Sequence, residues 1–451
     1  MKLHILGICG TFMGGIARLA QQLGHQVAGS DQNVYPPMSE ELARLGIAVG
    51  QGYEPGRLDP RPDLVIVGNA LSRGNSSVEH VLSEKIPYIS GPQWLAENVL
   101  PGRRVFAVSG THGKTTTASI LAWILHEAGR NPGFLIGGVP ENFGCSAAIG
   151  GPDLFVVEAD EYDTAFFDKR SKFVHYHPDV LIISNIEYDH ADIFPDVAAI
   201  NRQFHHLVRT VPGNGRIIAR AASPQIDAVL EMGYWSPLTR FGNVSSDWHS
   251  APLNRDYSEF EVIHAGQTVG VVNWPLFGEH NAQNALAALV AAQQAGVAPQ
   301  QACASLSGFA SVKRRLQLLA SVDGVSVYDD FAHHPTAIKS AVQALRSRIG
   351  EERLIAVLEL RSNTMKAGIH KHTLAGALGD ADLVCVHEPP GLGWDLRGSL
   401  NGLGERLRIF PGVADIIGHL AQIRMRHDHV LIMSNGGFEN IYRRFIERLS
   451  N

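Results

Sequence analysis

Short apolar runs alternate with amphipathic segments along the whole 451-residue chain. In the first part of the chain the runs are typical of buried strands, and the segments between them carry apolar residues at helical spacing. The predicted strands cover residues 3–6, 26–30, 64–67 and 88–90, and the predicted helices cover residues 14–23, 39–45 and 77–84. Strands and helices that follow each other in this order predict a parallel, Rossmann-like sheet.

A second α/β region follows the link at residues 100–104, where Pro101 and Gly102 are typical of a domain junction. Its predicted strands are residues 105–108, 154–157, 180–184 and 216–219, and its predicted helices are residues 118–128 and 282–295. Polar and apolar residues alternate at 259–263 and 268–273, on either side of Ala265-Gly266-Gln267. This alternation around turn residues predicts a β-hairpin.

A third α/β region begins near Val325, with predicted strands at residues 325–328, 354–358, 383–386 and 430–433. A chain of this length is sufficient for about three domains that each bury a core of their own. The predicted fold class is therefore α/β in three domains, at residues 1–103, 104–321 and 322–451. The first and the last of these domains are predicted to be Rossmann-like.

The composition narrows the class of protein. Hydrophobic residues make up 45% of the chain and charged residues 18%, which is typical of a soluble globular protein. No apolar run approaches the ~20 residues of a membrane span, so no membrane partner is expected. The N-terminus predicts a strand that enters a glycine turn, which is unlike a secretory signal.

Charge and cysteine usage exclude two further classes. The net charge is −6 and there is no long basic run, so nucleic acid is a poor candidate partner. The four cysteines are scattered without C-x-x-C spacing, which argues against a disulfide framework or a zinc site and favours a reducing cytoplasm. They are Cys9, Cys145, Cys303 and Cys385.

The clearest chemical motif is Ser109-Gly110-Thr111-His112-Gly113-Lys114-Thr115-Thr116, directly after the apolar run at 105–108. A strand that breaks into a glycine-rich turn and then a helix predicts a phosphate-binding loop, because backbone N–H groups and the helix dipole both face the anion. Lys114 is expected to reach the β- and γ-phosphates, and the Thr115 hydroxyl to ligate Mg²⁺. The strict G-x-x-x-x-G-K-S/T pattern fails at Val108, so the loop is a shortened variant.

Acidic residues follow the next predicted strand, in Glu158-Ala159-Asp160-Glu161-Tyr162-Asp163. Parallel strands place ligands at their carboxyl ends, and clustered carboxylates repel each other unless a cation joins them, so Mg²⁺ is the expected partner. His190 follows a neighbouring strand. Because imidazole is an uncommon Mg²⁺ ligand, chemistry alone leaves His190 as a hydrogen-bonding group near the metal or as a structural histidine.

Further polar residues lie at a predicted helix start and near the second domain junction. Asn281 and Asn284 share one helix face, where they either read a base edge or cap the helix, and capping is favoured from these residues alone. Arg315, which precedes Asp330, either meets a phosphate across a closing cleft or forms an interdomain salt bridge.

The order of these motifs resembles that of the Mur ligases, the ATP-dependent amide ligases of peptidoglycan synthesis. The resemblance covers essentially the whole chain and implies a UDP-sugar-binding domain, a P-loop-type central ATPase domain and a peptide-binding domain. The residues that carry it are Gly110-Thr111-His112-Gly113-Lys114-Thr115, Glu158 to Glu161, Asp189-His190, His280-Asn281 with Asn284, Arg315 and Asp330.

The resemblance also implies roles for individual residues. ATP would be bound by Gly110, Thr111, His112, Gly113, Lys114, Thr115, Thr116, Asn281, Asn284, Arg315 and Asp330. Mg²⁺ would be bound by Thr115, Glu158 and His190, and the catalytic residues would be Lys114, Glu158 and His190. The UDP-sugar would lie on Gly10, Thr11, Phe12, Met13 and Gly14. Arg361 with Asn363 would grip a carboxylate of the peptide, since arginine binds carboxylates bidentately; a surface arginine is the alternative for Arg361.

Within the family, the chain is similar to members that act on UDP-N-acetylmuramate in the bacterial cytoplasm. Several segments resemble those of members that add the recycled tripeptide L-Ala-γ-D-Glu-meso-diaminopimelate, namely residues 7–15, 161–173, 189–194 and 361–366. The alternative acceptor is L-alanine. Some relatives carry a carbamylated lysine in the central domain, but no lysine occurs between Lys172 and Lys313, so a second Mg²⁺ would use His190, a carboxylate or water.

Three other functions remain as alternatives. A folate- or cyanophycin-type ligase would share the central ATPase but not the UDP-sugar domain. A Rossmann oxidoreductase would account for the first domain, and a non-catalytic nucleotide-binding protein would bind ATP without releasing phosphate. Oligomeric state is not predicted by these patterns.

Overall fold

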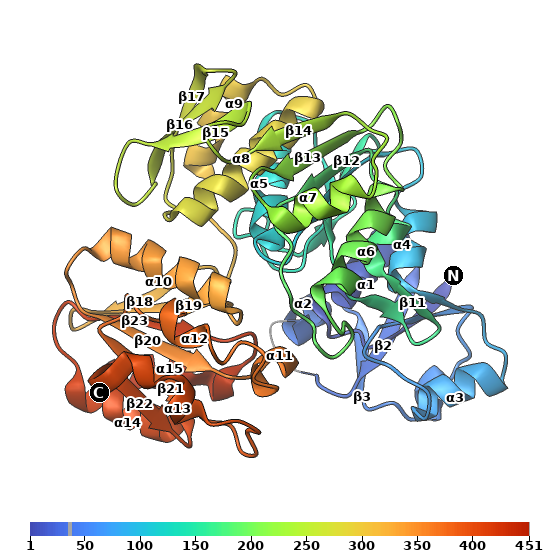
Figure 1. The fold of residues 1–451 in the computed structure, drawn as a ribbon. Coiled ribbons are helices and arrows are strands. Elements are labelled where there is room, and N and C mark those ends of the chain that lie inside the picture. Colours follow the sequence, from blue (N-terminus) through green and yellow to red (C-terminus); the bar gives the residue numbers. More distant parts are fainter. Residues whose placement is uncertain (35–37, 451) are drawn as a thin grey trace.

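The computed structural model describes residues 1–34 and 38–450 and contains three large sheets with their covering helices, called the first, central and third units below. In the view of Figure 1 the first unit (blue) and the third unit (orange to red) both lie below the central unit. The α/β class predicted from the sequence is confirmed, since strands and helices alternate through all three units.

The first unit is a five-stranded parallel sheet in the order β3-β2-β1-β4-β5, which confirms the predicted Rossmann-like arrangement. Its strands are β1 (Lys2–Leu6), β2 (Gln26–Asp31), β3 (Ala48–Gln51), β4 (Leu64–Val67) and β5 (Tyr88–Ser90). Its helices are α1 (Thr11–Gln22), α2 (Met38–Arg44), η1 (Pro55–Leu58), α3 (Ser76–Ser83) and α4 (Gly91–Asn98). β3 was not predicted, because this short edge strand is only half-buried and lacks a continuous apolar run.

Helix α1 begins at Thr11, so the predicted start at residue 14 is wrong. Gly10 is its N-cap, and the segment from Thr11 to Gly14 forms the first helical turn. The sequence interpretation assigned residues 11–13 to the glycine turn that precedes the helix. Within the helix Gly14 is closely packed, since a Cβ at this position would collide with the side chain of Met38.

The central unit is a ten-stranded sheet in the order β17-β16-β15-β14-β13-β12-β6-β9-β7-β8. Its strands are β6 (Arg104–Ser109), β7 (Gly133–Leu135), β8 (Ala147–Ala148), β9 (Leu154–Ala159), β12 (Val180–Ile183), β13 (Arg216–Arg220), β14 (Leu238–Phe241), β15 (Trp248–Pro252), β16 (Glu259–His264) and β17 (Gln267–Asn273). β6, β9 and β12 are parallel neighbours, so their carboxyl ends lie at one edge. The predicted hairpin is confirmed: β16 and β17 are antiparallel, and the turn between them has positive φ at Ala265 (48°) and Gly266 (75°).

A small antiparallel pair, β10 (Asp163–Ala165) and β11 (Asp168–Ser171), stands apart from the central sheet. The helices of the central unit are α5 (Lys114–Glu127), η2 (Lys172–His175), α6 (Val197–Val208), α7 (Pro224–Glu231), α8 (Glu279–Gln294), α9 (Pro299–Ser305) and η3 (Leu306–Gly308). α5 and α8 pack against each other in the core, where the small alanine side chains of α8 allow a close approach.

Helix α5 begins at Lys114, so the predicted start at residue 118 is also wrong. The intervening threonines, Thr115, Thr116 and Thr117, have low helix propensity, yet they form the first turn of α5. All three are buried in the first turn, where tertiary packing holds them helical.

The third unit is a six-stranded sheet in the order β18-β19-β23-β20-β21-β22, parallel except for β18. Its strands are β18 (Gln317–Val322), β19 (Val325–Asp330), β20 (Leu354–Glu359), β21 (Leu383–His387), β22 (Leu407–Phe410) and β23 (His429–Met433). Its helices are α10 (Pro335–Ile349), α11 (Asn363–Lys366), α12 (Leu374–Ala377), α13 (Leu396–Ser399), η4 (Asn401–Arg406), α14 (Val413–Ile423), η5 (Phe438–Asn440) and α15 (Ile441–Ser450). The expected boundary between residues 321 and 322 falls inside β18.

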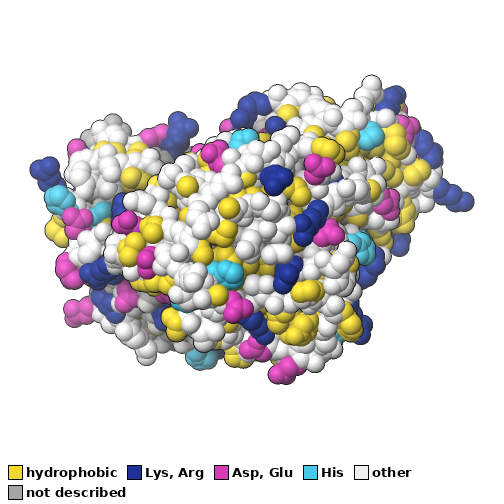
Figure 2. Space-filling model, turned by 90° about the horizontal axis from the view of Figure 1, so that it is seen from above, with side chains coloured by type: hydrophobic (Ala, Val, Ile, Leu, Met, Phe, Trp, Pro, Cys, Tyr) yellow, Lys and Arg dark blue, Asp and Glu magenta, His cyan; other side chains and the backbone are white. Residues whose placement is uncertain are grey.

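The helix lengths and the distribution of side chains on the surface bear on the partners expected from the sequence. Within the described ranges 1–34 and 38–450, no helix combines the length and the apolar character that a membrane crossing requires. On the face drawn in Figure 2, basic and acidic side chains are interspersed, and hydrophobic side chains are scattered among them.

Candidate active site

The loop between β6 and α5 is shaped to receive phosphates. Gly110 and Gly113 have positive φ, at 141° and 78°, which only glycine adopts without strain. Asn185 fixes the loop: its Oδ1 accepts the backbone N–H of His112 at 2.7 Å, and its Nδ2 donates to the His112 carbonyl at 3.0 Å. Gly113 also abuts the Oδ1 of Asn284, 2.5 Å from where a Cβ would stand. The N-terminal amides of α5 have no side-chain cap and are available to an anion.

Lys114 is the buried cation at the tip of this loop. Its Nζ lies 2.9 Å from Glu161 Oε2 and 3.4 Å from Asp160 Oδ1. Burial alone would lower the pKa of Lys114, but the charges of Glu161, Asp160 and Glu158 raise it above its usual value. The ammonium is therefore charged at neutral pH and is available to a phosphate oxygen.

Thr115 and Glu158 offer hard oxygen ligands beside the loop. The Thr115 hydroxyl donates to Glu158 Oε1 at 3.1 Å, the backbone N–H of Gly137 donates to Glu158 Oε2 at 2.7 Å, and Arg315 Nη2 donates to the Thr115 hydroxyl at 3.2 Å. Burial raises the pKa of Glu158, which marks a carboxylate that lacks a full counter-charge. A hydroxyl and a carboxylate next to a phosphate loop fit Mg²⁺, which prefers oxygen ligands and keeps phosphate and water in its shell.

His190 contacts the acidic segment that follows β9, at Glu161. Its Nε2 is 3.5 Å from Glu161 Oε1, and its backbone has a positive φ of 56°. Burial lowers the pKa of His190, but hydrogen bonding to Glu161 and the nearby carboxylates raise it overall. Ligand atoms of Asp160, Glu161 and His190 all lie within 4.8 Å of one another, a spacing that one metal ion could bridge.

A cavity of about 440 Å³ separates the loop from the third unit, and it contains most of the residues predicted for ATP. Asn281 and Asn284 line it from the start of α8. The expectation that they cap this helix is wrong: the N-cap is Gly278, and Asn281 instead donates to the carbonyl of Phe277 at 2.8 Å. Asn281 and Asn284 therefore lie where a nucleotide in the cavity could contact them.

The two arginines at the second junction have different partners. Arg314 pairs with Asp329 at 3.2 Å, inside the third unit. Arg315 reaches Thr115 in the central unit, and its guanidinium lies over the Phe331 ring at 5.1 Å. Asp330 accepts the backbone N–H of Leu316 at 2.8 Å and so fixes the segment that carries Arg315. This geometry favours the reading in which Arg315 meets a phosphate across the cleft.

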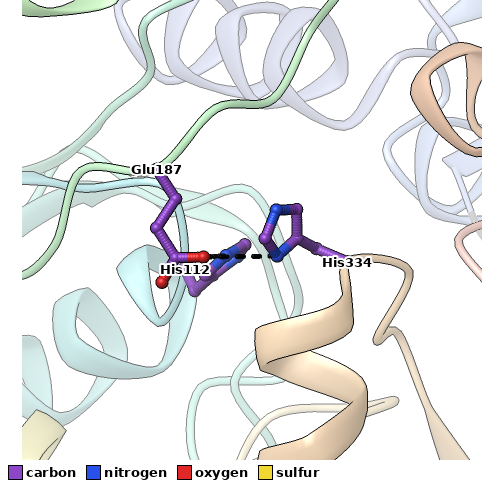
Figure 3. Close-up of side chains that lie close together, drawn as sticks. All are labelled: His112, Glu187 and His334. Atoms are coloured by element: carbon purple, nitrogen blue, oxygen red, sulfur yellow. Dashed lines mark ion pairs between the residues drawn. The ribbon is translucent and has the colours of Figure 1, made fainter. Parts of the chain in front are cut away.

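A cluster of His112, Glu187 and His334 was not predicted. Figure 3 shows the three side chains converging, with His334 at the start of α10 in the third unit. Glu187 Oε2 lies 3.5 Å from His112 Nε2 and 3.5 Å from His334 Nδ1, and it accepts the Thr336 hydroxyl at 2.6 Å. Burial lowers the pKa of His334 to about 3, so its imidazole is neutral. The signal in the sequence was that Glu187 follows β12, a parallel strand of the same sheet whose carboxyl end lies at the same edge as that of β9.

Two groups of predicted residues lie away from the cavity lining. The segment from Gly10 to Gly14 belongs to the first unit, at the start of α1. Arg361 packs against Gly436, where it leaves no space for a Cβ, and Asn363 Nδ2 donates to Asp192 Oδ2 at 3.4 Å. None of these residues lines the phosphate cavity.

The loop has the shape of a phosphate-binding loop, and it faces a separate unit that can bring a second substrate. This arrangement is typical of ATP-dependent ligases, and the family models place the protein in that class. Family models match all three units: "Mur ligase family, catalytic domain" at residues 2–101, "Mur ligase middle domain" at 108–292 and "Mur ligase, glutamate ligase domain" at 314–436. The chain belongs to the Mur ligase family.

Relatives and solved structures extend this result over the full length. The chain is 52% identical to the UDP-N-acetylmuramate–L-alanyl-γ-D-glutamyl-meso-2,6-diaminoheptandioate ligase of Escherichia coli, over 100% of this chain and 98% of that protein. It is 32% identical to the UDP-N-acetylmuramate–L-alanine ligase of Rubrobacter xylanophilus, over 87% of this chain and 85% of that protein. A crystal structure of a murein peptide ligase from Psychrobacter arcticus has a TM-score of 0.78 and 45% identity, over 100% of this chain and 99% of that one.

Proposed function

We propose that this enzyme joins the lactyl carboxylate of UDP-N-acetylmuramate to the free amine of the tripeptide L-Ala-γ-D-Glu-meso-diaminopimelate, with conversion of ATP to ADP and phosphate. The observation that carries this proposal is the end-to-end similarity to the tripeptide-adding relative, which clearly exceeds the similarity to the alanine-adding one. The product would be a peptidoglycan precursor rebuilt from recycled peptide in a bacterial cytoplasm.

The residues in the cavity support a two-step reaction. In the first step the lactyl carboxylate attacks the γ-phosphorus of ATP, so that an O–P bond forms and ADP leaves. In the second step the uncharged amine attacks the acyl carbonyl, phosphate leaves and the amine nitrogen loses its proton. Lys114 neutralises phosphate charge, and Arg315 approaches from the third unit. Placement and charge neutralisation supply most of the catalysis in reactions of this kind.

We assign Mg²⁺ to Thr115 and Glu158, where it would neutralise charge on the phosphates, with His190 as a further ligand. The 3.1 Å contact between the Thr115 hydroxyl and Glu158 supports the first two ligands, whereas His190 clusters with Asp160 and Glu161. Asn281 and Asn284 would lie beside the adenine. The segment from Gly10 to Gly14 would hold the diphosphate of the UDP-sugar, since Gly10 is the N-cap of a twelve-residue helix that has no side-chain cap.

We further propose that the sugar, ATP and peptide domains correspond to the three units. The first boundary is placed between residues 103 and 104, at the start of β6. The second is placed before Arg314, because Arg314 pairs with Asp329 and β18 pairs with β19 in the third sheet.

The acceptor is tested by supplying the enzyme with ATP, Mg²⁺ and UDP-N-acetylmuramate and measuring phosphate release with either acceptor. We expect release with the tripeptide and only background release with free L-alanine. A reaction without UDP-N-acetylmuramate is the control for idle ATP hydrolysis. Release with L-alanine and none with the tripeptide would contradict the proposed acceptor.

Arg361 provides a test of the peptide site. Its guanidinium is expected to bind a carboxylate of the tripeptide, so Arg361→Ala should raise the KM for tripeptide about tenfold or more, since hydrogen bonds to charged groups contribute about 1.5–3 kcal/mol. The KM values for ATP and UDP-N-acetylmuramate should not change. An unaltered KM for the tripeptide would show that Arg361 is a surface residue without a role in binding.

A further inference from the structure

Lys172 is a buried cation for which the proposed function has no role. It is the first residue of η2, only 9% exposed, and its backbone N–H donates to the Tyr162 carbonyl at 2.9 Å. Its Nζ donates to Asp160 Oδ2 at 3.2 Å. Burying an ammonium is costly unless it is well paired, so a lysine held in this position requires explanation.

Lys172 lies where the first and central units meet. Its Nζ is 5.6 Å from the centre of the Phe12 ring, in the first turn of α1, and 5.7 Å from the centre of the Tyr162 ring. The helix η2 packs against α4 of the first unit. Lys172 therefore connects the segment assigned to the sugar diphosphate with the acidic strand end beside Lys114.

The carboxylates around Lys172 are shared with other cations. Asp160 also accepts a charge contact from Lys114, at 3.4 Å. Glu161 is in turn shared between Lys114, at 2.9 Å, and His190, at 3.5 Å. Three basic groups thus alternate with two carboxylates in one row, and Lys172 is at the end of the row that lies against the first unit.

The other cations of this segment are already paired and face solvent. Lys169 pairs with Asp163 at 2.6 Å, and Arg170 pairs with Asp168 at 2.6 Å; both side chains are more than half exposed, at 68% and 64%. Lys172, by contrast, has a side chain that is 11% exposed and points inward. Lys172 is thus the basic residue of the 163–172 segment that is placed to meet a substrate in the interior.

We propose that Lys172 binds the lactyl carboxylate of the sugar substrate and guides it from α1 to the phosphate loop, an inference that rests on the proposed function. A UDP-sugar whose diphosphate lies at the start of α1 must extend its carboxylate towards Lys114 to be phosphorylated. Lys172 is the buried cation between these two points. It would hold the carboxylate in place while Lys114 turns to the phosphates of ATP.

The test is the affinity of Lys172→Met for two nucleotide sugars, measured by titration calorimetry. UDP-N-acetylglucosamine serves as the matched probe, because it has the same diphosphate as UDP-N-acetylmuramate but lacks the lactyl carboxylate. We expect the variant to bind UDP-N-acetylmuramate at least about tenfold more weakly, as is typical when a charged partner is lost. Its affinity for UDP-N-acetylglucosamine and for ATP should match that of the wild type.

Control variants separate charge from structure. Lys172→Arg keeps the charge and should recover most of the affinity, whereas Lys169→Met, in the same segment, should behave as the wild type. Lys172→Gln keeps a hydrogen-bond donor for Asp160 and replaces Lys172→Met if the methionine variant does not fold.

Each outcome decides between explanations. Unchanged affinity for UDP-N-acetylmuramate overturns the inference, and equal weakening of both nucleotide sugars overturns it in favour of a diphosphate contact. Loss of ATP affinity in the same variant also overturns it, since Lys172 would then act by ordering Asp160 and Lys114. A wild-type protein that binds neither nucleotide sugar contradicts the proposed function instead.

Discussion

Replacement of Lys114 by alanine is expected to lower the turnover number at least about a hundredfold, because removing one preorganised donor to developing charge typically costs about 3–4 kcal/mol in the barrier. The Lys114 ammonium is buried at the start of α5, and its pKa is raised by Glu161 and Asp160 despite burial, so it carries full charge towards the phosphates. The measurement is phosphate release at saturating ATP, UDP-N-acetylmuramate and tripeptide.

This variant also removes the partner of two acidic side chains, so its folding must be checked by thermal unfolding. Lys85→Ala is a suitable control, because Lys85 is an exposed lysine of the first unit and is not part of the cavity lining. Near-normal turnover of a folded Lys114→Ala variant would contradict the assignment of the phosphate loop.

Replacement of Glu158 by glutamine is expected to shift the Mg²⁺ dependence of the reaction to higher concentrations and to lower the rate by about a hundredfold or more at a fixed, low Mg²⁺ concentration, since Mg²⁺ is held by few carboxylates. Glutamine keeps the size of the side chain and one oxygen, which can accept from either Gly137 or Thr115 but not from both, since these donors bind different oxygens of Glu158. The negative charge is lost, and with it the attraction to the cation. The measurement is phosphate release across a Mg²⁺ titration.

Asp153→Asn is the matched control, because Asp153 is an exposed acid just before the opposite end of β9. It loses the same charge at the far end of the strand and should leave the Mg²⁺ dependence unchanged. An unaltered Mg²⁺ dependence in Glu158→Gln would assign the metal to other residues.

Several strands that the sequence predicted correctly share one property. β6, β20 and β23 are buried on both faces of parallel sheets, and such strands appear as unbroken apolar runs that local sequence identifies. The edge strands β3 and β18 carry mixed residues, and they were not predicted. Their partners, rather than their own residues, hold them extended.

The helix starts show the same limit. Thr11 and Lys114 begin α1 and α5 although the glycines and threonines beside them disfavour helix. In each case contact with a distant segment, such as that between Gly14 and Met38, decides the conformation. Local propensity contributes too little free energy to resist such packing.

The candidate site likewise contains features that local sequence predicts and features that only the tertiary structure reveals. The phosphate loop and the acids of Glu158 to Glu161 were proposed from neighbouring residues, because each is a short segment with its own chemistry, whereas the residues alone favoured helix capping for Asn281 and Asn284. The cluster of Glu187 and His334 was not predicted, since Glu187 and its partner Thr336 are 149 positions apart in the chain. The contact of Lys172 with Phe12 of the first unit is likewise visible only in the tertiary structure.

The sequence by itself determined the family to which the chain belongs, and it predicted a phosphate-binding loop and oxygen ligands for a hard cation. Consecutive residues suffice for this, because backbone turns and side-chain chemistry are local. Only the tertiary structure decided which charges face each other, as in the row from Lys172 through Asp160, Lys114 and Glu161 to His190. Such pairings arise where segments that follow neighbouring strands of one sheet come together, and burial is what makes those charges depend on one another.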